Sequence, residues 1–240
     1  MLKLLYWPVR WFIYAPIFAL NTLLIASACV VLAKISPTFA TRHIAPLWAK
    51  IGFMAAPACL KVSGRQHIDN QQAYVVVANH VSQFDILALY GFLGLDLKWV
   101  MKQELRKAPI IGAACAAMGH VFLNRESSTE AMKALEAVKE QLEPGMSIMF
   151  FPEGTRTDGT KIRRFKRGAF MMAKNLDLPI LPISIKGTEK ILPNGTLDLM
   201  PGKAEIIIHE PISVAKVREL RDRDLAKLSE ETVKKGLGLA

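Results

Sequence analysis

The sequence reads Tyr74-Val75-Val76-Val77-Ala78-Asn79-His80-Val81-Ser82-Gln83-Phe84-Asp85 where a strand pattern gives way to a helix pattern. The β-branched run that ends at Ala78 predicts a buried strand, and Asn79 begins a polar turn. Ser82, followed three residues later by Asp85 and an apolar run, is typical of a helix start with a variant capping box. The stretch therefore predicts a strand–turn–helix unit that holds His80 in its turn.

His80 and Asp85 are candidates for a catalytic pair. On one continuous helix of about 3.6 residues per turn their side chains would point about 140° apart. They can meet only if His80 precedes the helix and Asp85 lies in its first turn. A carboxylate that accepts a hydrogen bond from one ring nitrogen leaves the other able to take a proton. For two isolated residues, the simpler interpretation is a helix cap beside an ordinary turn histidine.

Strand and helix patterns alternate along the rest of the chain. Predicted strands are Tyr74–Ala78, Lys98–Met101, Val121–Leu123, Ser147–Phe151, Ile180–Ile185 and Ala204–His209. Predicted helices are Ser82–Phe92, Gln103–Met118 with a bend near Pro109, Ser128–Leu142, and a solvated closing helix over Arg218–Lys235. This alternation predicts an α/β fold with a mixed, mostly parallel sheet flanked by helices.

The N-terminal segment has a different composition. Seven of the ten net positive charges lie in the first 68 residues, which contain no acidic residue. Between them, Trp11–Ala33 carries no charge and is long enough to cross a bilayer, which needs about 20 apolar residues. A second apolar stretch covers Ile44–Leu60. We therefore expect a membrane-anchoring helical segment over residues 1–62 and an α/β domain over residues 63–240.

Two arrangements of this segment fit the sequence. Either Trp11–Ala33 spans the membrane once, or the two apolar stretches form a helical hairpin in one leaflet with Ser36-Pro37 at its turn. We favour the hairpin, because positive charges flank the first stretch on both sides and so give a single span no orientation. Basic residues that punctuate apolar runs indicate a membrane surface and argue against nucleic-acid binding.

The cysteines and histidines exclude several classes of site. Cys29, Cys59 and Cys115 lie in apolar surroundings and form no CxxC pair, which is typical of reduced thiols in the cytoplasm. The five histidines are scattered, with no second ligand at metal-binding spacing. The sequence contains no P-loop and no dinucleotide-binding fingerprint. We therefore expect no metal and no bound cofactor.

Other chemically useful residues follow predicted strands. Arg125 comes after Val121–Leu123, and Phe151-Pro152-Glu153-Gly154-Thr155-Arg156 places a carboxylate, a hydroxyl and a guanidinium in one turn. Lys102 follows a third strand, and Pro179 and Pro182 bracket a fourth, which they predict to be an edge or entry strand. Each feature alone fits an ordinary surface turn. Together they predict a base with its orienting carboxylate, two arginines that grip a phosphate, and apolar walls.

These motifs resemble a known family. Asn79-His80-x4-Asp85, Gly119-x-Val121-Phe122-Leu123-x-Arg125, Phe151-Pro152-Glu153-Gly154-Thr155-Arg156 and the Pro179/Pro182 strand stand in order along the chain. They resemble the four blocks of the glycerolipid acyltransferases, specifically the 1-acyl-sn-glycerol-3-phosphate (lysophosphatidic acid) acyltransferases. The blocks cover residues 79–183, which is less than half of the chain.

The resemblance implies transfer of a fatty acyl group from acyl carrier protein or coenzyme A to the sn-2 hydroxyl of lysophosphatidate, giving phosphatidate. His80 is then the general base and Asp85 orients it. The hydroxyl attacks the thioester directly, so Ser82 is a helix cap and no enzyme nucleophile is needed. The implied substrate-binding residues are Lys102, Arg125, Glu153, Gly154, Thr155 and Arg156. The backbone amides of residues 78–80 are candidate oxyanion donors.

A basic loop extends this predicted site. Residues 156–167 carry six cations against one acid, and we expect them to meet anionic lipid headgroups or an acidic carrier protein. The expected location is the inner (cytoplasmic) membrane, with the site facing the cytoplasm. Two alternatives stay open: an acyltransferase for glycerol 3-phosphate, another lysophospholipid or an amino-lipid, and a non-catalytic lipid-binding protein.

Overall fold

The structure, a computed structural model, describes residues 2–124, 143 and 145–239. Within these residues seven strands form one sheet in the order β1-β7-β6-β2-β5-β3-β4. Every neighbouring pair is parallel except β6 and β7. The strands are β1 (Ala58–Ser63), β2 (Val75–Ala78), β3 (Asp96–Lys102), β4 (Val121–Leu123), β5 (Met146–Phe150), β6 (Ile180–Lys186) and β7 (Gly202–Ile208). The predicted mixed, mostly parallel sheet is confirmed.

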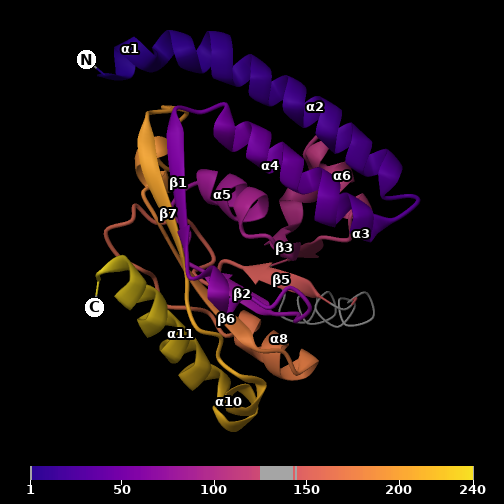
Figure 1. Cartoon of the computed structure of the whole chain (residues 1–240), viewed down its shortest axis with the longest axis vertical. Coiled ribbons are helices and arrows are strands. Elements are labelled where there is room, and N and C mark those ends of the chain that lie inside the picture. Colours follow the sequence, from indigo (N-terminus) through magenta and orange to yellow (C-terminus); the bar gives the residue numbers. More distant parts are fainter. Residues whose placement is uncertain (1, 125–142, 144, 240) are drawn as a thin grey trace.

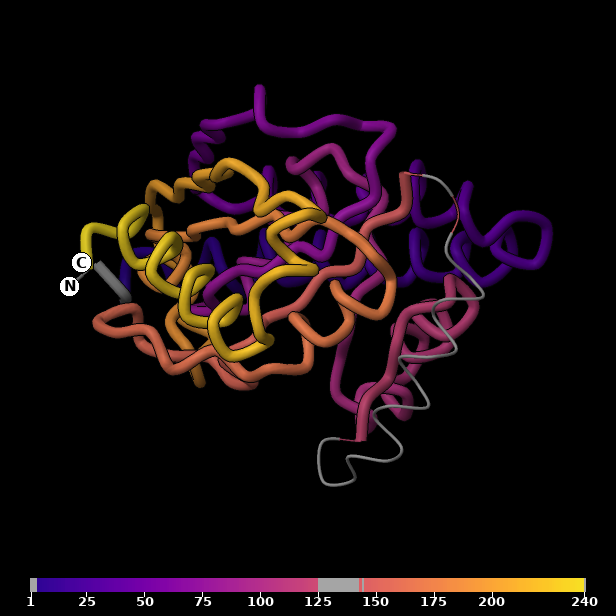
Figure 2. Tube along the Cα trace, turned by 90° about the horizontal axis from the view of Figure 1, so that it is seen from below, coloured from indigo at the N-terminus to yellow at the C-terminus, as the bar shows by residue number. Residues whose placement is uncertain are grey.

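Helices cover both faces of the sheet (Figures 1 and 2). Because side chains alternate along a strand, Val76 and Ala78 of β2 enter one core while Val75 and Val77 enter the other. The helices on the first face are α4 (Ala45–Met54), α5 (Phe84–Phe92) and α6 (Ile111–Ala117), and those on the second are α8 (Gly168–Leu176), α10 (Val214–Glu219) and α11 (Asp222–Leu237). Short helical segments are η3 (Arg65–His67), η4 (Gln103–Lys107) and α9 (Thr188–Ile191).

The N-terminal segment folds as a helical hairpin that lies along the first face (Figure 1). Helix α1 (Leu2–Pro8), η1 (Val9–Tyr14) and α2 (Ala15–Leu32) run without a break. The chain turns at Ser36, whose hydroxyl accepts the N–H of Phe39 at 3.2 Å, and then returns through α3 (Pro37–Phe39), η2 (Ala40–Ile44) and α4. The two apolar stretches therefore form a hairpin with its turn at Ser36-Pro37, and its seating in one leaflet stays a prediction.

Hydrogen bonds of polar side chains connect the two arms of this hairpin. The side-chain amide of Asn21 donates to the carbonyl of Trp48 at 2.9 Å, and the indole of Trp48 donates to the hydroxyl of Thr22 at 2.9 Å. Asn21 is thus a buried contact between helices within an apolar run. The helix Leu4–Leu32 is long and apolar enough to cross a membrane and is mostly exposed, which suggests membrane association.

Strand β1 was not predicted. We assigned the apolar stretch through Leu60 to the membrane segment, but Ala58–Ser63 pairs in parallel with β7 at the edge of the sheet. Apolar residues lie on both sides of Pro57, so hydrophobicity alone does not show the change there from a helix to a strand. Residues 58–62 therefore contribute to the sheet and not to the hairpin.

The prediction that the proline-bracketed strand lies at an edge is wrong. Strand β6 lies between β2 and β7 in the middle of the sheet. The carbonyl of Pro182 accepts the N–H of His209, just beyond the end of β7. Since the N–H and C=O of one strand residue point the same way, the missing N–H of Pro182 faces the place where β7 ends. The ladder from β6 to β2 stays intact.

The observed helices are more divided than the predicted ones. Gln103–Met118 is two pieces, η4 and α6, separated by residues 108–110, and the closing helix is divided into α10 and α11. Helix α8 was not predicted, because its nine residues follow directly on the basic loop. The predicted helix Ser128–Leu142 lies outside the described residues.

Helices α4 and α5 approach closely at Gly91, so this position tests the packing. A Cβ added at Gly91 would lie 3.0 Å from the backbone nitrogen of Lys50. We expect Gly91→Leu to lower the free energy of unfolding by about 1–3 kcal/mol, because the helices must separate. The control is Gly168→Leu in α8, where a Cβ meets nothing within 4 Å. Thermal unfolding in detergent that gives equal losses for the two variants would contradict this packing.

Candidate active site

His80 and Asp85 meet as predicted. Strand β2 ends at Ala78, α5 begins at Phe84, and Asp85 lies in the first turn of α5 with its side chain fully buried. The Nδ1 of His80 lies 2.7 Å from Oδ2 of Asp85. The same oxygen accepts the backbone N–H groups of Val81 and Ser82 at 2.8 and 2.9 Å. Backbone donors at a helix N-terminus stabilise the negative charge of this carboxylate.

Thr188 holds the other oxygen of Asp85 and was missed from the sequence. Its hydroxyl donates to Oδ1 at 2.5 Å, and the residue is completely buried at the start of α9. Gly187 precedes it at φ +87°, and a Cβ there would lie 2.1 Å from the carbonyl oxygen of Lys203. A Gly-Thr pair directly after the Ile180–Ile185 strand was the available indication, because side chains at the carboxyl ends of parallel strands meet.

Ser82 has a structural role at the start of α5, as predicted, but it lies one residue before the N-cap position, which Gln83 occupies. Its hydroxyl accepts the N–H of Phe84 at 3.0 Å and donates to the carbonyl of Leu192 at 2.6 Å. Since a hydroxyl has one proton and the carbonyl of Leu192 takes it, the oxygen of Ser82 is engaged on both sides. This arrangement leaves the imidazole of His80 as the exposed reactive group of the turn.

The imidazole of His80 presents one nitrogen outward. Its ring stacks on Phe151 with centroids 3.8 Å apart and planes 8° apart, and Phe151 in turn contacts the ring of Trp99. The His80 side chain is 15% exposed. Because Nδ1 faces a carboxylate, it carries the ring proton, and Nε2 keeps its lone pair. Nε2 has no hydrogen-bond partner within the part of the chain that the structure describes.

Glu153 is not placed to bind a substrate, contrary to the prediction. Glu153 as a whole residue is only 2% exposed to solvent. Oε1 accepts the backbone N–H of His80 and Oε2 that of Arg163, both at 2.8 Å. Burial raises the pKa of this carboxyl above its ordinary value. Glu153 therefore fixes the backbone of the site from beneath, and it occupies the His80 amide that we considered as an oxyanion donor.

The rest of that turn does face outward. Gly154 adopts φ +75°, Thr155 is exposed and Arg156 is half-buried. Arg156 makes no hydrogen bond or ion pair with any described residue. The N–H of Thr157 donates to the carbonyl of His80 at 2.9 Å, so both backbone groups of His80 are bound by this turn. Residues 154–156 thus lie beside the backbone of His80.

The two remaining residues that we predicted to bind the substrate are Lys102 and Arg125. Lys102 ends β3, is exposed, and forms an ion pair with Glu104 at 3.0 Å. Strand β3 is two positions from β2 in the sheet. At about 5 Å per strand, the backbone of Lys102 lies about 10 Å from the end of β2, along the same edge of the sheet. Arg125 lies outside the described residues, so its place in the site stays a prediction.

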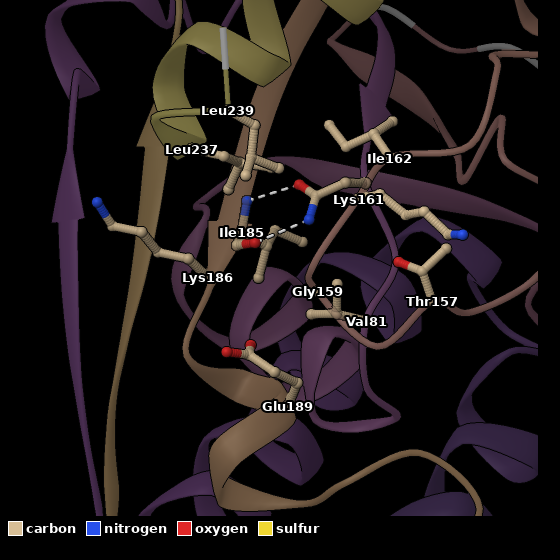
Figure 3. Close-up of a pocket in the computed structure, with 11 residues that line it drawn as sticks. Val81, Thr157, Gly159, Lys161, Ile162, Ile185, Lys186, Glu189, Leu237 and Leu239 are labelled. Atoms are coloured by element: carbon tan, nitrogen blue, oxygen red, sulfur yellow. Dashed lines mark hydrogen bonds between the residues drawn. The ribbon is translucent and has the colours of Figure 1, made fainter.

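A small pocket is lined by Asn79 and Val81, the two neighbours of His80 in the chain (Figure 3). The side-chain amide of Asn79 exchanges two hydrogen bonds of 2.8 Å with the backbone of Ile185, drawn as dashed lines, and so extends the β2–β6 ladder. The pocket has a volume of about 60 Å³ and is lined by Thr157 and Glu189 among others. It has room for a few water molecules but not for an acyl chain.

Comparisons with known proteins agree with this geometry. The sequence model of the Acyltransferase family matches residues 59–186. The chain is 34% identical to the chloroplastic 1-acyl-sn-glycerol-3-phosphate acyltransferase LPAT1 of Arabidopsis thaliana, over 79% of this chain and 53% of that protein. It is 27% identical to the 1-acyl-sn-glycerol-3-phosphate acyltransferase of Borreliella burgdorferi, over 78% of this chain and 80% of that protein.

A solved structure is also similar. The crystal structure of the 1-acyl-sn-glycerophosphate (LPA) acyltransferase PlsC from Thermotoga maritima matches with a TM-score of 0.72 and 28% identity, covering 92% of this chain and 96% of that one. The chain spans about half the length of the curated plant relatives that it matches.

The buried role of Glu153 gives a stability prediction. Glu153→Ala removes the acceptor from two backbone N–H groups, at a cost of about 1–3 kcal/mol for each donor left unpaired. We expect a smaller loss for Glu153→Gln, whose carbonyl oxygen can keep one of the two bonds. Denaturant unfolding measures both variants. An alanine variant as stable as the wild type would show that Glu153 does not fix this backbone.

Proposed function

The chain belongs to the acyltransferase family, and we propose that it acylates the sn-2 hydroxyl of lysophosphatidate, using a fatty acyl thioester, to form phosphatidate. The observation that carries this proposal is the arrangement of His80, with Nδ1 bound to Asp85, Nε2 without a partner among the described residues, and its backbone bonded to Glu153 and Thr157 on either side of residues 154–156. The names of the relatives support the same acceptor.

The proposed reaction is a direct transfer. Nε2 of His80 removes the proton of the sn-2 hydroxyl as its oxygen attacks the thioester carbonyl carbon. The tetrahedral intermediate collapses, the carbon–sulfur bond breaks, and the imidazolium returns the proton to the leaving thiolate. Asp85 stabilises the imidazolium during this cycle because its carboxylate stays within 2.7 Å of Nδ1. Phe151 fixes the plane of the ring by stacking.

The acyl donor already carries the activation that the reaction needs, so we propose that no metal or bound cofactor takes part. Among the described residues, no group of three or more His, Cys, Asp and Glu is arranged to hold a metal ion. Either acyl carrier protein or coenzyme A can supply the thioester. A product assay with each donor separates these two possibilities.

The phosphate of the acceptor binds, in this proposal, at the Gly154–Arg156 turn. Arg156 offers a planar set of donors that suits a phosphate oxygen pair, and it has no partner among the described residues. Thr155 is exposed beside it and can donate its hydroxyl. Arg125 is proposed as the second guanidinium and Lys102 as a more distant cation at the same edge.

The hairpin is proposed to seat the enzyme in one leaflet of the inner membrane, with the site on the cytoplasmic side. Large apolar side chains stay exposed along it, including Leu5, Phe12, Leu20, Leu24 and Met54. Such a surface exceeds what a soluble monomer normally exposes. The other face of the hairpin packs on the domain through α4, α5 and α6, so the hairpin lies against the domain and does not project from it (Figure 1).

The base assignment is tested by His80→Ala. We expect turnover to fall by about 10²- to 10⁴-fold, because no other described group replaces a positioned general base. The assay follows phosphatidate formation from radiolabelled lysophosphatidate, with glycerol 3-phosphate and other lysolipids as competing acceptors. Vesicle binding and the melting temperature, which should both be retained, are the controls. Near-normal turnover in the folded variant would rule out His80 as the base.

The membrane assignment is tested by Leu20→Asp combined with Leu24→Asp on the exposed face of α2. Burying one Leu side chain contributes about 1.5–3 kcal/mol, so we expect binding to phospholipid vesicles to weaken by more than about 100-fold. Leu239→Asp, at an exposed leucine away from the hairpin, is the matched control. Unchanged flotation of the double variant would argue against seating through this face.

A further inference from the structure

The basic loop is held rigidly beside the site. Its six cations are Arg156, Lys161, Arg163, Arg164, Lys166 and Arg167, and none of them has an ion-pair partner within the described residues. The loop backbone is nevertheless fixed. Phe165 is 2% exposed, and its N–H donates to Glu230 at 3.0 Å. The cations are therefore presented from an ordered backbone, and no described carboxylate forms an ion pair with them.

Two of these cations are hydrogen-bonded through their backbones to the start of the turn beside His80. The N–H of Lys166 donates to the carbonyl of Pro152 at 2.9 Å, directly before the Glu153–Arg156 turn. The N–H of Arg163 is bound by the carboxylate of Glu153. The backbone of Lys166 is thus bonded to the same turn that binds the N–H and the C=O of His80.

The side chain of Lys166 then lies over Gly154. A Cβ added at Gly154 would come within 2.7 Å of Nζ and 3.0 Å of Cε of Lys166. Glycine at this position therefore permits two things, the backbone at φ +75° and the approach of the ammonium group. No other cation of the loop comes this near to Gly154.

The ammonium of Lys166 is not used to neutralise the carboxylate beneath it. Both oxygens of Glu153 are taken by backbone N–H groups. Lys166 makes no hydrogen bond through Nζ to any described residue. Among the described residues, neither the ammonium of Lys166 nor the guanidinium of Arg156 has a partner, and both lie at one glycine turn that is bonded to the backbone of His80.

We propose that Lys166 binds the phosphate monoester of the acceptor lipid together with Arg156, and that it selects acceptors carrying this group. The proposal rests on the proposed function. A phosphate monoester carries close to two negative charges near neutral pH, which two cations at one turn can match. The planar guanidinium sets the orientation of the phosphate, and the compact ammonium adds a point charge. The sn-2 hydroxyl is close to the phosphate in the lipid, so binding here brings it to Nε2.

The test compares Lys166→Gln with Lys166→Arg in steady-state assays. A lost charged hydrogen bond corresponds to a rise of roughly 10- to 150-fold in the KM for lysophosphatidate, with kcat changed much less. Lys166→Arg should recover most of the affinity. Lys216→Gln is the matched control. It removes the same single charge from an exposed lysine of α10, away from the site. An unchanged KM for Lys166→Gln, or equal rises for both glutamine variants, overturns the proposal.

A second acceptor separates this proposal from the proposed function. Monoacylglycerol has the hydroxyl and the acyl chain but no phosphate, so we expect the wild type and Lys166→Gln to acylate it at the same rate. If Lys166→Gln lowers the rate of acylation of both acceptors by the same factor, Lys166 does not select for phosphate. If the wild type acylates no lysophosphatidate, the proposed function fails, and calorimetric titration with glycerol 3-phosphate still decides whether Lys166 binds a phosphate monoester. Binding lost in Lys166→Gln supports the site, and equal binding rejects it.

Discussion

The carboxylate of Asp85 joins the elements on which the site depends. It accepts hydrogen bonds from the imidazole of His80, from two backbone N–H groups of the turn, and from the hydroxyl of Thr188. These donors come from the turn between β2 and α5 and from the start of α9, while Asp85 itself lies in the first turn of α5. A fully buried carboxylate is costly unless its oxygens are satisfied, and here four donors satisfy it. The same bonds that permit its burial therefore fix the ring of His80.

The apolar hairpin is fixed to the same region through the chain that follows α9. Arg10 in the first helix donates to Asp198 at 2.5 Å and to the carbonyl of Leu197 at 3.1 Å. This segment is only about ten residues beyond Thr188, and Leu192 between them accepts the hydroxyl of Ser82. The exposed apolar surface and the imidazole are therefore held in a fixed relation. The proposed acceptor, a lipid in the membrane, requires this relation, because its headgroup must reach the proposed base.

The sequence was sufficient where local pattern decides structure. It predicted six of the strands, the strand–turn–helix unit and the contact between His80 and Asp85, because strand runs and helix caps are local. It missed β1 and Thr188, and it misplaced β6, because these depend on which strands pair across more than 100 residues. The role of Glu153 was also wrong. A glutamate in a glycine turn looks the same in the sequence whether it faces solvent or accepts backbone N–H groups beneath the site.

The central claim is that Asp85 holds His80 with its proton on Nδ1 and its lone pair on Nε2. Nitrogen-15 NMR of the protein with ring-labelled histidine tests this directly, with the His80 signals assigned by their loss in His80→Gln. We expect neutral His80 in the wild type to be the Nδ1–H tautomer, and Asp85→Asn to lose this preference. Neutral His80 found as the Nε2–H tautomer in the wild type would contradict the account, since that nitrogen could not then accept a proton.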